Sequence, residues 1–213
     1  MPGDHVTIRP ARPDRADGAH FARYLDLAGD GLFRWMLGRR SAAILAEAYP
    51  TPGHDLSYEH VRFAEVGGEV AGMLSGYTAA DHARASDEPL EKAAGIHKLR
   101  LWAAGLLAAP VLGFMGRLAE GDWYLQAVAV DPARRGAGIG SVLLDHAEQA
   151  ARRTGSRRIV LDVAVDNEGA RRLYERRGMA IEARSPTIPF TSGNAVYRMA
   201  VNVTPDPANQ PQP

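Results

Sequence analysis

The sequence contains no cysteine. This absence excludes a disulfide framework, a thiolate nucleophile, an iron–sulfur cluster and a thiolate zinc site. The seven histidines show no His-Glu-x-x-His or other ligand spacing, so we expect no metal. Any chemistry must therefore use oxygen and nitrogen groups.

An excess of charge of either sign is also lacking. The chain has 25 basic and 25 acidic side chains, and its pI is about 7.1. Because this balance creates no global field, neither nucleic acid nor an anionic membrane is an expected partner. The segment Met1-Pro2-Gly3-Asp4-His5 lacks the basic and apolar regions of a signal peptide, which favours a cytoplasmic location.

Long hydrophobic runs are few, and the most apolar stretch is Leu101 to Gly116. It is shorter than the roughly 20 residues of a membrane span. It also contains Pro110 and is flanked by Lys98 and Arg117. We therefore expect a buried helix pair, or a contact within a homodimer, in place of a membrane anchor.

The overall composition is that of a soluble globular protein. Of 213 residues, 46% are hydrophobic and 23% are charged. This length suits one domain, which we place at residues 1–203. The proline-rich residues 204–213 cannot bury enough apolar surface to order themselves, and we expect a disordered tail there.

Local patterns predict a mixed α/β fold. Apolar spacing, glycines and prolines mark the expected strands and helices. Residues 67–68, Gly-Gly, predict a tight hairpin turn. An insertion at residues 78–120 combines a polar loop at 78–91 with a helix at 99–118 that breaks near Pro110. The other expected strands are 5–10, 61–66, 69–77, 123–130, 159–165, 180–184 and 195–203, and the other expected helices are 14–27, 32–49, 141–154 and 170–177.

Three glycines, Gly136, Gly138 and Gly140, lie between an expected strand and the start of a helix. A helix N-terminus presents unpaired N–H groups and partial positive charge, and glycines let an anion approach the backbone closely. Arg134 and Arg135 add formal positive charge beside this loop. The segment therefore predicts a diphosphate ligand.

Other glycine-loop families fit less well. A Walker A loop requires a lysine after Gly140, and Ser141 stands there. The Gly-x-Gly-x-x-Gly fingerprint of dinucleotide-binding domains fails in register. A module that binds NAD or ATP is thus an alternative that the register disfavours.

Two blocks of sequence resemble the GNAT N-acetyltransferase superfamily. Arg135-x-x-Gly138-x-Gly140, followed by Val-Leu-Leu, is similar to the acetyl-CoA loop of that family. Residues 167–179, Asn-Glu-Gly-Ala-Arg-Arg-Leu-Tyr-Glu-Arg-Arg-Gly-Met, resemble its Asn-x-x-Ala-x-x-Leu-Tyr-x-x-x-Gly-Phe segment. The insertion at 78–120 has no counterpart in this pattern. The resemblance implies a twisted, mostly antiparallel sheet with a splayed central strand pair and helices on both faces.

The resemblance also implies a site for acetyl-CoA. The backbone of one splayed strand would pair with the pantetheine arm, the loop amides would hold the pyrophosphate, and Asn167 would bond the pantetheine region or the splayed strands. Tyr174 would stand near the sulfur, where a phenol can protonate the leaving thiolate. The implied cofactor-binding residues are Val128, Ala129, Val130, Arg135, Gly136, Ala137, Gly138, Ile139, Gly140, Ser141, Asn167 and Tyr174.

The implied reaction is acetyl transfer to the primary amine of a small molecule or peptide, by direct attack in a ternary complex. Family members often place a glutamate base near the position of Gln126, and glutamine cannot be a base. Asp162, Glu65, His60 or a water chain remain as alternatives. Gln126 also supports a different function, that of a non-catalytic acyl-CoA-binding module.

The acceptor is expected between the first helices and the insertion. Three aromatic residues of this region are expected in the core, with the lining of an acceptor pocket as the alternative. They are Phe33, Trp35 and Trp102.

Overall fold

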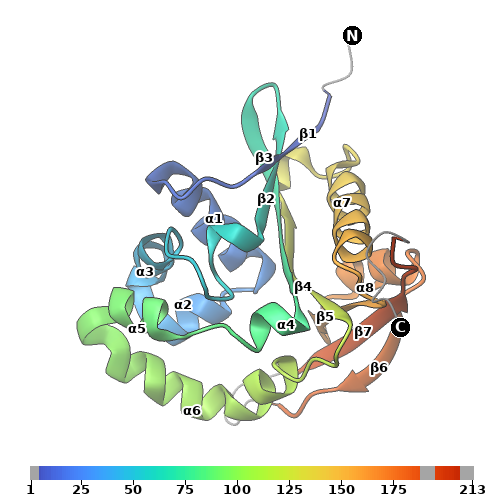
Figure 1. Cartoon of the computed structure of the whole chain (residues 1–213). Coiled ribbons are helices and arrows are strands. Elements are labelled where there is room, and N and C mark those ends of the chain that lie inside the picture. The colour runs from blue at the N-terminus through green and yellow to red at the C-terminus, as the bar shows by residue number, and fades with distance from the viewer. Residues whose placement is uncertain (1–4, 188–194, 207–213) are drawn as a thin grey trace.

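The computed structural model describes residues 5–187 and 195–206 (Figure 1). One twisted sheet has the strand order β1-β2-β3-β4-β5-β7-β6. All neighbouring strands are antiparallel except β4 and β5, which are parallel. The expected mixed α/β fold with a mostly antiparallel sheet is confirmed. The strands are β1 (Thr7–Pro10), β2 (Val61–Val66), β3 (Glu69–Thr78), β4 (Asp122–Val130), β5 (Arg158–Ala164), β6 (Ala180–Arg184) and β7 (Val196–Asn202).

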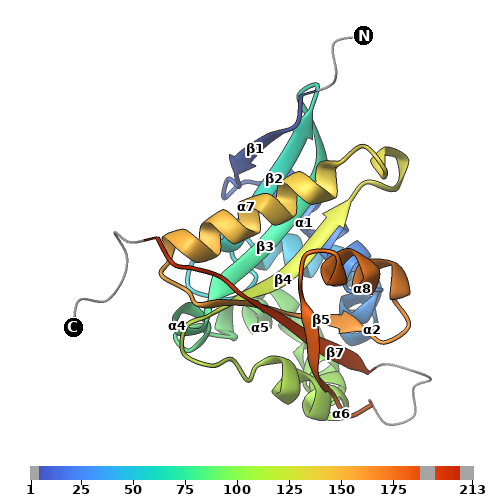
Figure 2. The same cartoon turned by 90° about the vertical axis from the view of Figure 1, so that its right-hand side faces the viewer.

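Helices cover both faces of the sheet (Figures 1 and 2). Against one face, the first helices pack on Phe63 and Met73. Against the other, α7 and α8 pack on Leu74, Leu125 and Leu161. The helices are α1 (Arg15–Ala28), α2 (Leu32–Leu37), α3 (Ser41–Ala48), α4 (Ala79–His82), α5 (Glu88–Ala94), α6 (Lys98–Met115), α7 (Ile139–Arg153) and α8 (Glu168–Glu175).

The hairpin of β2 and β3 has the expected turn. Gly67 and Gly68 have φ values of 61° and 83°, which is the left-handed backbone that a two-residue primed turn needs. This hairpin places β3 beside β4, the strand that precedes the glycine loop.

The single helix expected at residues 32–49 is wrong. It is divided into α2 and α3 by a 3₁₀ turn at Gly38–Arg40. Gly38 has a φ of 77°, a value outside the helical region that glycine adopts without steric cost. The apolar spacing persists on both sides of this turn, so periodicity alone does not reveal the break.

The expected loop at residues 78–91 is also partly helical. Thr78 caps α4 by accepting a hydrogen bond from the Asp81 amide, and the Asp81 carboxylate accepts one from the Thr78 amide. This capping box stabilises a single helical turn in a polar segment. Farther along, α5 begins at Glu88, with Pro89 in its first turn.

The expected break near Pro110 is wrong, because α6 continues through this residue. Pro110 is exposed, and so is Leu106 one turn earlier, whose carbonyl would otherwise receive the missing hydrogen bond. A carbonyl near solvent can bond to water instead, which lowers the cost of the proline.

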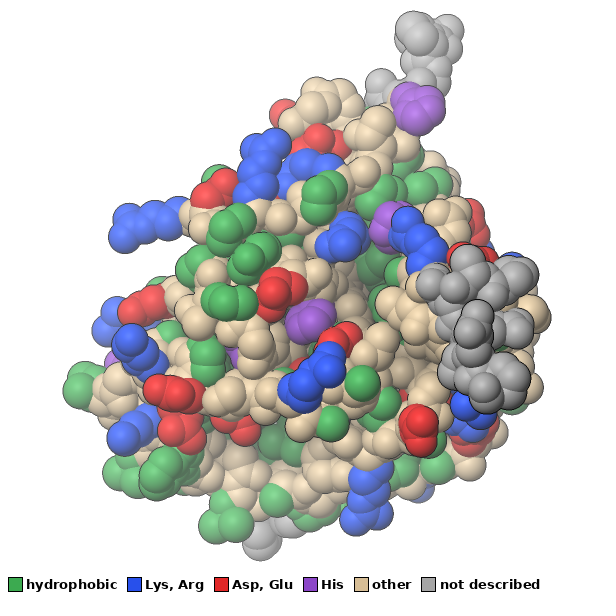
Figure 3. Space-filling view, in the orientation of Figure 1, with side chains coloured by type: hydrophobic (Ala, Val, Ile, Leu, Met, Phe, Trp, Pro, Cys, Tyr) green, Lys and Arg blue, Asp and Glu red, His purple; other side chains and the backbone are tan. Residues whose placement is uncertain are grey.

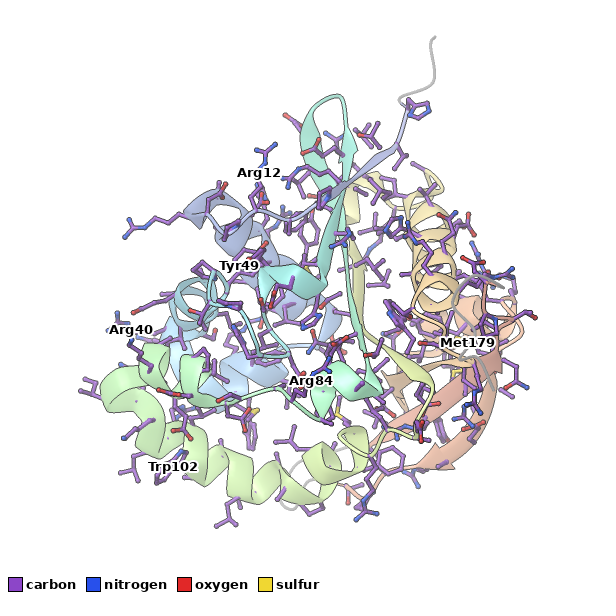
Figure 4. All side chains as sticks on the ribbon, viewed as in Figure 1. Arg12, Arg40, Tyr49, Arg84, Trp102 and Met179 are labelled. Atoms are coloured by element: carbon purple, nitrogen blue, oxygen red, sulfur yellow. The ribbon has the colours of Figure 1, made fainter. Side chains whose placement is uncertain are left out.

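The outer face of α6 is apolar. Leu106 is 79% exposed, and Trp102, expected in the core, is 55% exposed at the periphery of the molecule (Figure 4). The helical run Glu88–Met115 is the one stretch within the described residues that is long and apolar enough to cross a membrane. This segment therefore forms one half-covered helix and not a buried helix pair.

The expected tail lies mostly outside the described residues. Residues 204–206 have no regular secondary structure, and the Asp206 amide donates to the Arg152 carbonyl at 3.1 Å. Residues 207–213 are not described.

Candidate active site

The central parallel strands separate halfway along their length. β4 and β5 pair only over Asp122–Leu125 and Arg158–Leu161, although β4 continues to Val130 and β5 to Ala164. Figure 2 shows the two strands diverging from this point. Val128 and Val130 are half-buried, Ala129 is buried, and this part of β4 pairs with β3 on its other side. The expected splayed strand pair is confirmed.

Gln126 lies at the start of the separation. The β3–β4 register shifts here: Ser75 pairs with Ala127 and Gly76 with Leu125, so Gln126 is the extra residue of a β-bulge. Its side-chain oxygen accepts a hydrogen bond from the Ser75 hydroxyl at 2.8 Å. The bulge thus fixes the Gln126 amide at the point where β4 leaves β5.

The glycine loop follows β4 and remains open. Gly136 and Gly138 have φ values of 82° and 80°, and a Cβ atom added to either would meet no atom within 4 Å. Arg135, Ala137 and the two glycines are exposed. A side chain would therefore have room here but would require a strained left-handed backbone.

The amides of the loop are available to a ligand. Ser141 N–H returns to the Gly138 carbonyl at 3.0 Å, and α7 begins at Ile139 with Gly138 as its N-cap. Among the described residues, the amides from Arg135 to Gly140 have no hydrogen-bond acceptor. Together with the positive end of the helix dipole, this row of donors suits phosphate oxygens. It brings together the expected pyrophosphate residues Arg135, Gly136, Ala137, Gly138, Ile139, Gly140 and Ser141.

Ion pairs hold the beginning of the loop. Arg23 of α1 bonds to Asp131 at 2.8 Å, and Arg134 bonds to Glu69 of the hairpin. Arg134 is therefore tied to β3, whereas the sequence placed it with Arg135 beside the phosphate. The exposed Arg135 is the arginine better placed to meet an anion.

Tyr174 and Asn167 lie on α8, near the far side of the splay. Tyr174 packs against the cluster of Leu125 and Leu161, and burial raises its pKa to about 12. Such a phenol stays protonated at neutral pH and can donate a proton. The Asn167 side-chain oxygen caps α8 by accepting from the Ala170 amide at 3.1 Å. Part of the hydrogen-bonding capacity of Asn167 is thus used in shaping the helix start.

A buried polar network occupies the opposite face of the sheet below the bulge. Asp162 accepts hydrogen bonds from Tyr124 at 3.0 Å and from Arg198 at 2.8 and 3.1 Å, and its side chain is 0% exposed. Arg198 also donates to the carbonyls of Arg117 and Met115 at the end of α6. Burial raises the pKa of Asp162, and the ion pair with Arg198 opposes this shift.

An aspartate–histidine pair lies beside this network. His82 Nδ1 is 2.7 Å from the Asp55 carboxylate, and the His82 ring stacks on Tyr77 at a centroid distance of 5.7 Å. Tyr77 in turn contacts Tyr124, with ring centroids 5.5 Å apart. Burial raises the pKa of Tyr77, and Asp55 raises it further, while Gln126 lowers it. Gln126, Tyr77 and the histidine pair thus form one connected surface.

The structure sorts the base candidates by position. Asp162 is enclosed by Arg198 and Tyr124, and Glu65 pairs with Arg9 at the β1–β2 edge, one strand removed from β3. His60 meets the edge of the Tyr77 ring, and burial lowers its pKa.

Sequence reasoning did not identify His82 or Asp55. They belong to segments without a recognisable motif and come together only through packing on Tyr77. Within the described residues, no group of three or more histidine, aspartate or glutamate side chains could hold a metal.

Comparison with known proteins identifies the family. The model of the acetyltransferase (GNAT) family matches residues 33–179. The chain belongs to the GNAT acetyltransferase family. Its sequence relation extends to a crystal structure of an acetyltransferase with 31% identity and a TM-score of 0.65, covering 92% of this chain and 99% of that one. No curated protein matches the sequence.

Two more distant structures share the GNAT fold. An N-acetyltransferase from Staphylococcus aureus Mu50 has 20% identity and a TM-score of 0.67, covering 92% of this chain and 100% of that one. A chain of the NatC complex bound to Gag peptide and CoA has 13% identity and a TM-score of 0.54, covering 94% and 99%. As a GNAT acetyltransferase, the protein is an acyltransferase of a family that generally uses acyl-CoA.

Proposed function

We propose that the protein transfers an acetyl group from acetyl-CoA to a primary amine of a small molecule or peptide. The observation that carries this proposal is the open loop from Arg135 to Gly140, whose unpartnered amides lie at the end of a splayed strand. The loop would hold the pyrophosphate and the β4 edge from Val128 to Val130 would pair with the pantetheine arm. The thioester would then reach the bulge at Gln126.

The reaction proceeds by direct attack. The neutral amine nitrogen forms a bond to the thioester carbonyl carbon, the C–S bond breaks, and the electron pair leaves on sulfur. Tyr174 donates its phenolic proton to the departing thiolate, which its raised pKa permits at neutral pH. The products are an N-acetyl amide and CoA, and no acyl-enzyme forms, so the absence of cysteine is no obstacle.

We assign the removal of the amine proton to His82. Its Nδ1 is bonded to Asp55, which leaves Nε2 as the proton acceptor. The ring lies on Tyr77, next to the amide of Gln126 where the thioester would sit. An aspartate that orients an imidazole also stabilises the imidazolium that forms when the base accepts a proton.

A ligand titration tests the cofactor. We expect acetyl-CoA and CoA to raise the Tm, and NAD and ATP to leave it unchanged. A ligand at about 100 times its Kd stabilises the fold by about 2.7 kcal/mol. A shift with NAD or ATP but none with CoA species would overturn the assignment of the loop.

Release of CoA in the presence of a panel of amines tests catalysis. Tyr174→Phe should lower kcat about 10–100-fold with unchanged affinity for acetyl-CoA. Tyr197→Phe, a change of a half-buried tyrosine on β7, is the matched control. His82→Asn should lower kcat about 100-fold. Binding of acetyl-CoA without turnover on any amine would instead favour the non-catalytic acyl-CoA-binding module.

A further inference from the structure

A second cavity lies far from the glycine loop. It has a volume of about 180 Å³ and lies between the 58–62 and 74–78 segments and the C-terminal part of α7. The space-filling view shows a hollow here, with blue and purple side chains at its rim (Figure 3). The loop is at the other end of α7, which at 15 residues is about 22 Å long. Its titratable lining residues are Glu59, His60, Arg62, Asp81, His146 and Arg153.

Arg62 lies half-buried in this cavity without an acidic partner. Its guanidinium donates to the carbonyls of Val61 at 2.8 Å and Glu59 at 3.4 Å. No carboxylate of the described residues forms an ion pair with it. Burial lowers the pKa of Arg62, and the positive charge of Arg153 lowers it further. The site therefore holds a cation whose charge is not balanced locally.

The two acids of the cavity are engaged elsewhere. The Glu59 carboxylate accepts hydrogen bonds from the Gly53 amide at 2.9 Å and the Ser57 hydroxyl at 3.3 Å. The Asp81 carboxylate is bonded to Thr78 and Arg84. Their negative charge is thus already partnered at the lower edge of the cavity.

His146 completes a basic wall. It projects from α7 into the same cavity, one wall of which also carries Arg153, two turns along the helix. Burial lowers the pKa of His146, and the positive charges of Arg153 and Arg62 lower it further. Three basic groups from β2 and α7 therefore face one small space, where an anion would relieve their repulsion.

We propose that this cavity binds a phosphate-sized oxyanion, held by Arg62 and Arg153 with His146 as a further donor. Guanidinium groups present paired N–H donors that match two oxygens of one phosphate. The chemistry is that of inorganic phosphate or a phosphate group on a small metabolite. This second site is separate from the proposed acetyl-CoA loop and does not depend on the proposed function.

The test is an NMR titration of the full chain with inorganic phosphate, followed at the His146 imidazole. We expect a saturable shift and a rise of the His146 pKa, because a bound anion favours the imidazolium. Arg62→Gln should weaken phosphate binding about tenfold or more. Arg39→Gln, which removes an exposed arginine outside the cavity, is the charge-matched control and should change the Kd less than about twofold.

Further arms identify the anion and the site. Sulfate should compete with phosphate, and acetate should not. Equal competition by acetate would overturn the phosphate assignment in favour of carboxylates. Should Arg62→Gln fail to fold, Arg153→Gln changes an exposed residue of the same wall and serves instead.

Saturating CoA distinguishes the cavity from the loop. We expect the His146 response to phosphate to persist when the loop is occupied. Loss of that response, absence of any saturable shift, or equal Kd values for Arg62→Gln and Arg39→Gln would each overturn the proposal. Phosphate binding at His146 in a protein that fails to bind acetyl-CoA would support the cavity and reject the proposed function alone.

Discussion

The glycine loop and the buried network around Asp162 are built in opposite ways. The loop is a contiguous, exposed segment that offers backbone amides. The network joins side chains that are far apart in sequence: Tyr124 and Arg198 are 38 and 36 residues from Asp162. Backbone donors remain when most loop side chains change, whereas a buried network depends on every one of its members.

Their glycines show the same contrast. At Gly138 an added Cβ meets nothing within 4 Å, but at Gly76 it would lie 2.3 Å from the Trp123 ring. The loop glycine is required for its backbone conformation, and the strand glycine for the space it leaves. One region is therefore sensitive to ligand binding and the other to packing.

The largest expected effect breaks the buried network. Arg198→Met leaves the Asp162 carboxylate buried without its cation and should lower the free energy of unfolding by about 3–5 kcal/mol. Urea denaturation measures it. The double variant with Asp162→Asn removes the stranded charge and should recover part of the loss. A loss below 1 kcal/mol for the single variant would show that the pair is not essential.

The next effect separates ligand binding from stability. Gly138→Val should weaken acetyl-CoA binding about 100-fold, or about 2.7 kcal/mol, because its backbone would leave the left-handed region that aims the amides. Gly53→Val is the matched control, since Gly53 has a φ of 79° and open space but lies outside the loop. Calorimetric titration should show loss of affinity only for Gly138→Val; equal affinities would contradict the role of the loop.

A smaller effect probes the packing of the bulge. Gly76→Ala should cost about 1–3 kcal/mol, because the methyl group meets the buried Trp123 ring. Gly105→Ala, in α6 with nothing within 4 Å, should instead stabilise the protein by about 0.5–1 kcal/mol. Thermal denaturation compares the two. An unchanged Tm for Gly76→Ala would mean that Trp123 can move aside.

The smallest effect concerns pH. Burial lowers the pKa of His54, His60 and His146 in the folded protein. As pH falls below about 6.5, the unfolded chain therefore binds protons first and stability decreases, by about 1 kcal/mol between pH 7.5 and 5.5. Urea midpoints at both values measure this. His54→Gln should reduce the slope, and an unchanged slope would exclude His54 as a contributor.

The sequence alone determined the fold class and the glycine loop. Adjacent residues encode both: a strand that ends at Val130, glycines with the required φ values, and a helix that begins at Ile139. The hairpin turn at Gly67 and Gly68 was predictable for the same reason. In each case the physical constraint acts between neighbours in the chain, so a local pattern contains it.

Only the tertiary structure decided the rest. The turn at Gly38 and the uninterrupted helix through Pro110 depend on what packs around them or on access to solvent. The His82–Asp55 pair and the basic wall of Arg62, Arg153 and His146 join segments that no motif links. Side-chain proximity, burial and charge balance arise from how the sheet and helices pack, and sequence spacing does not encode them.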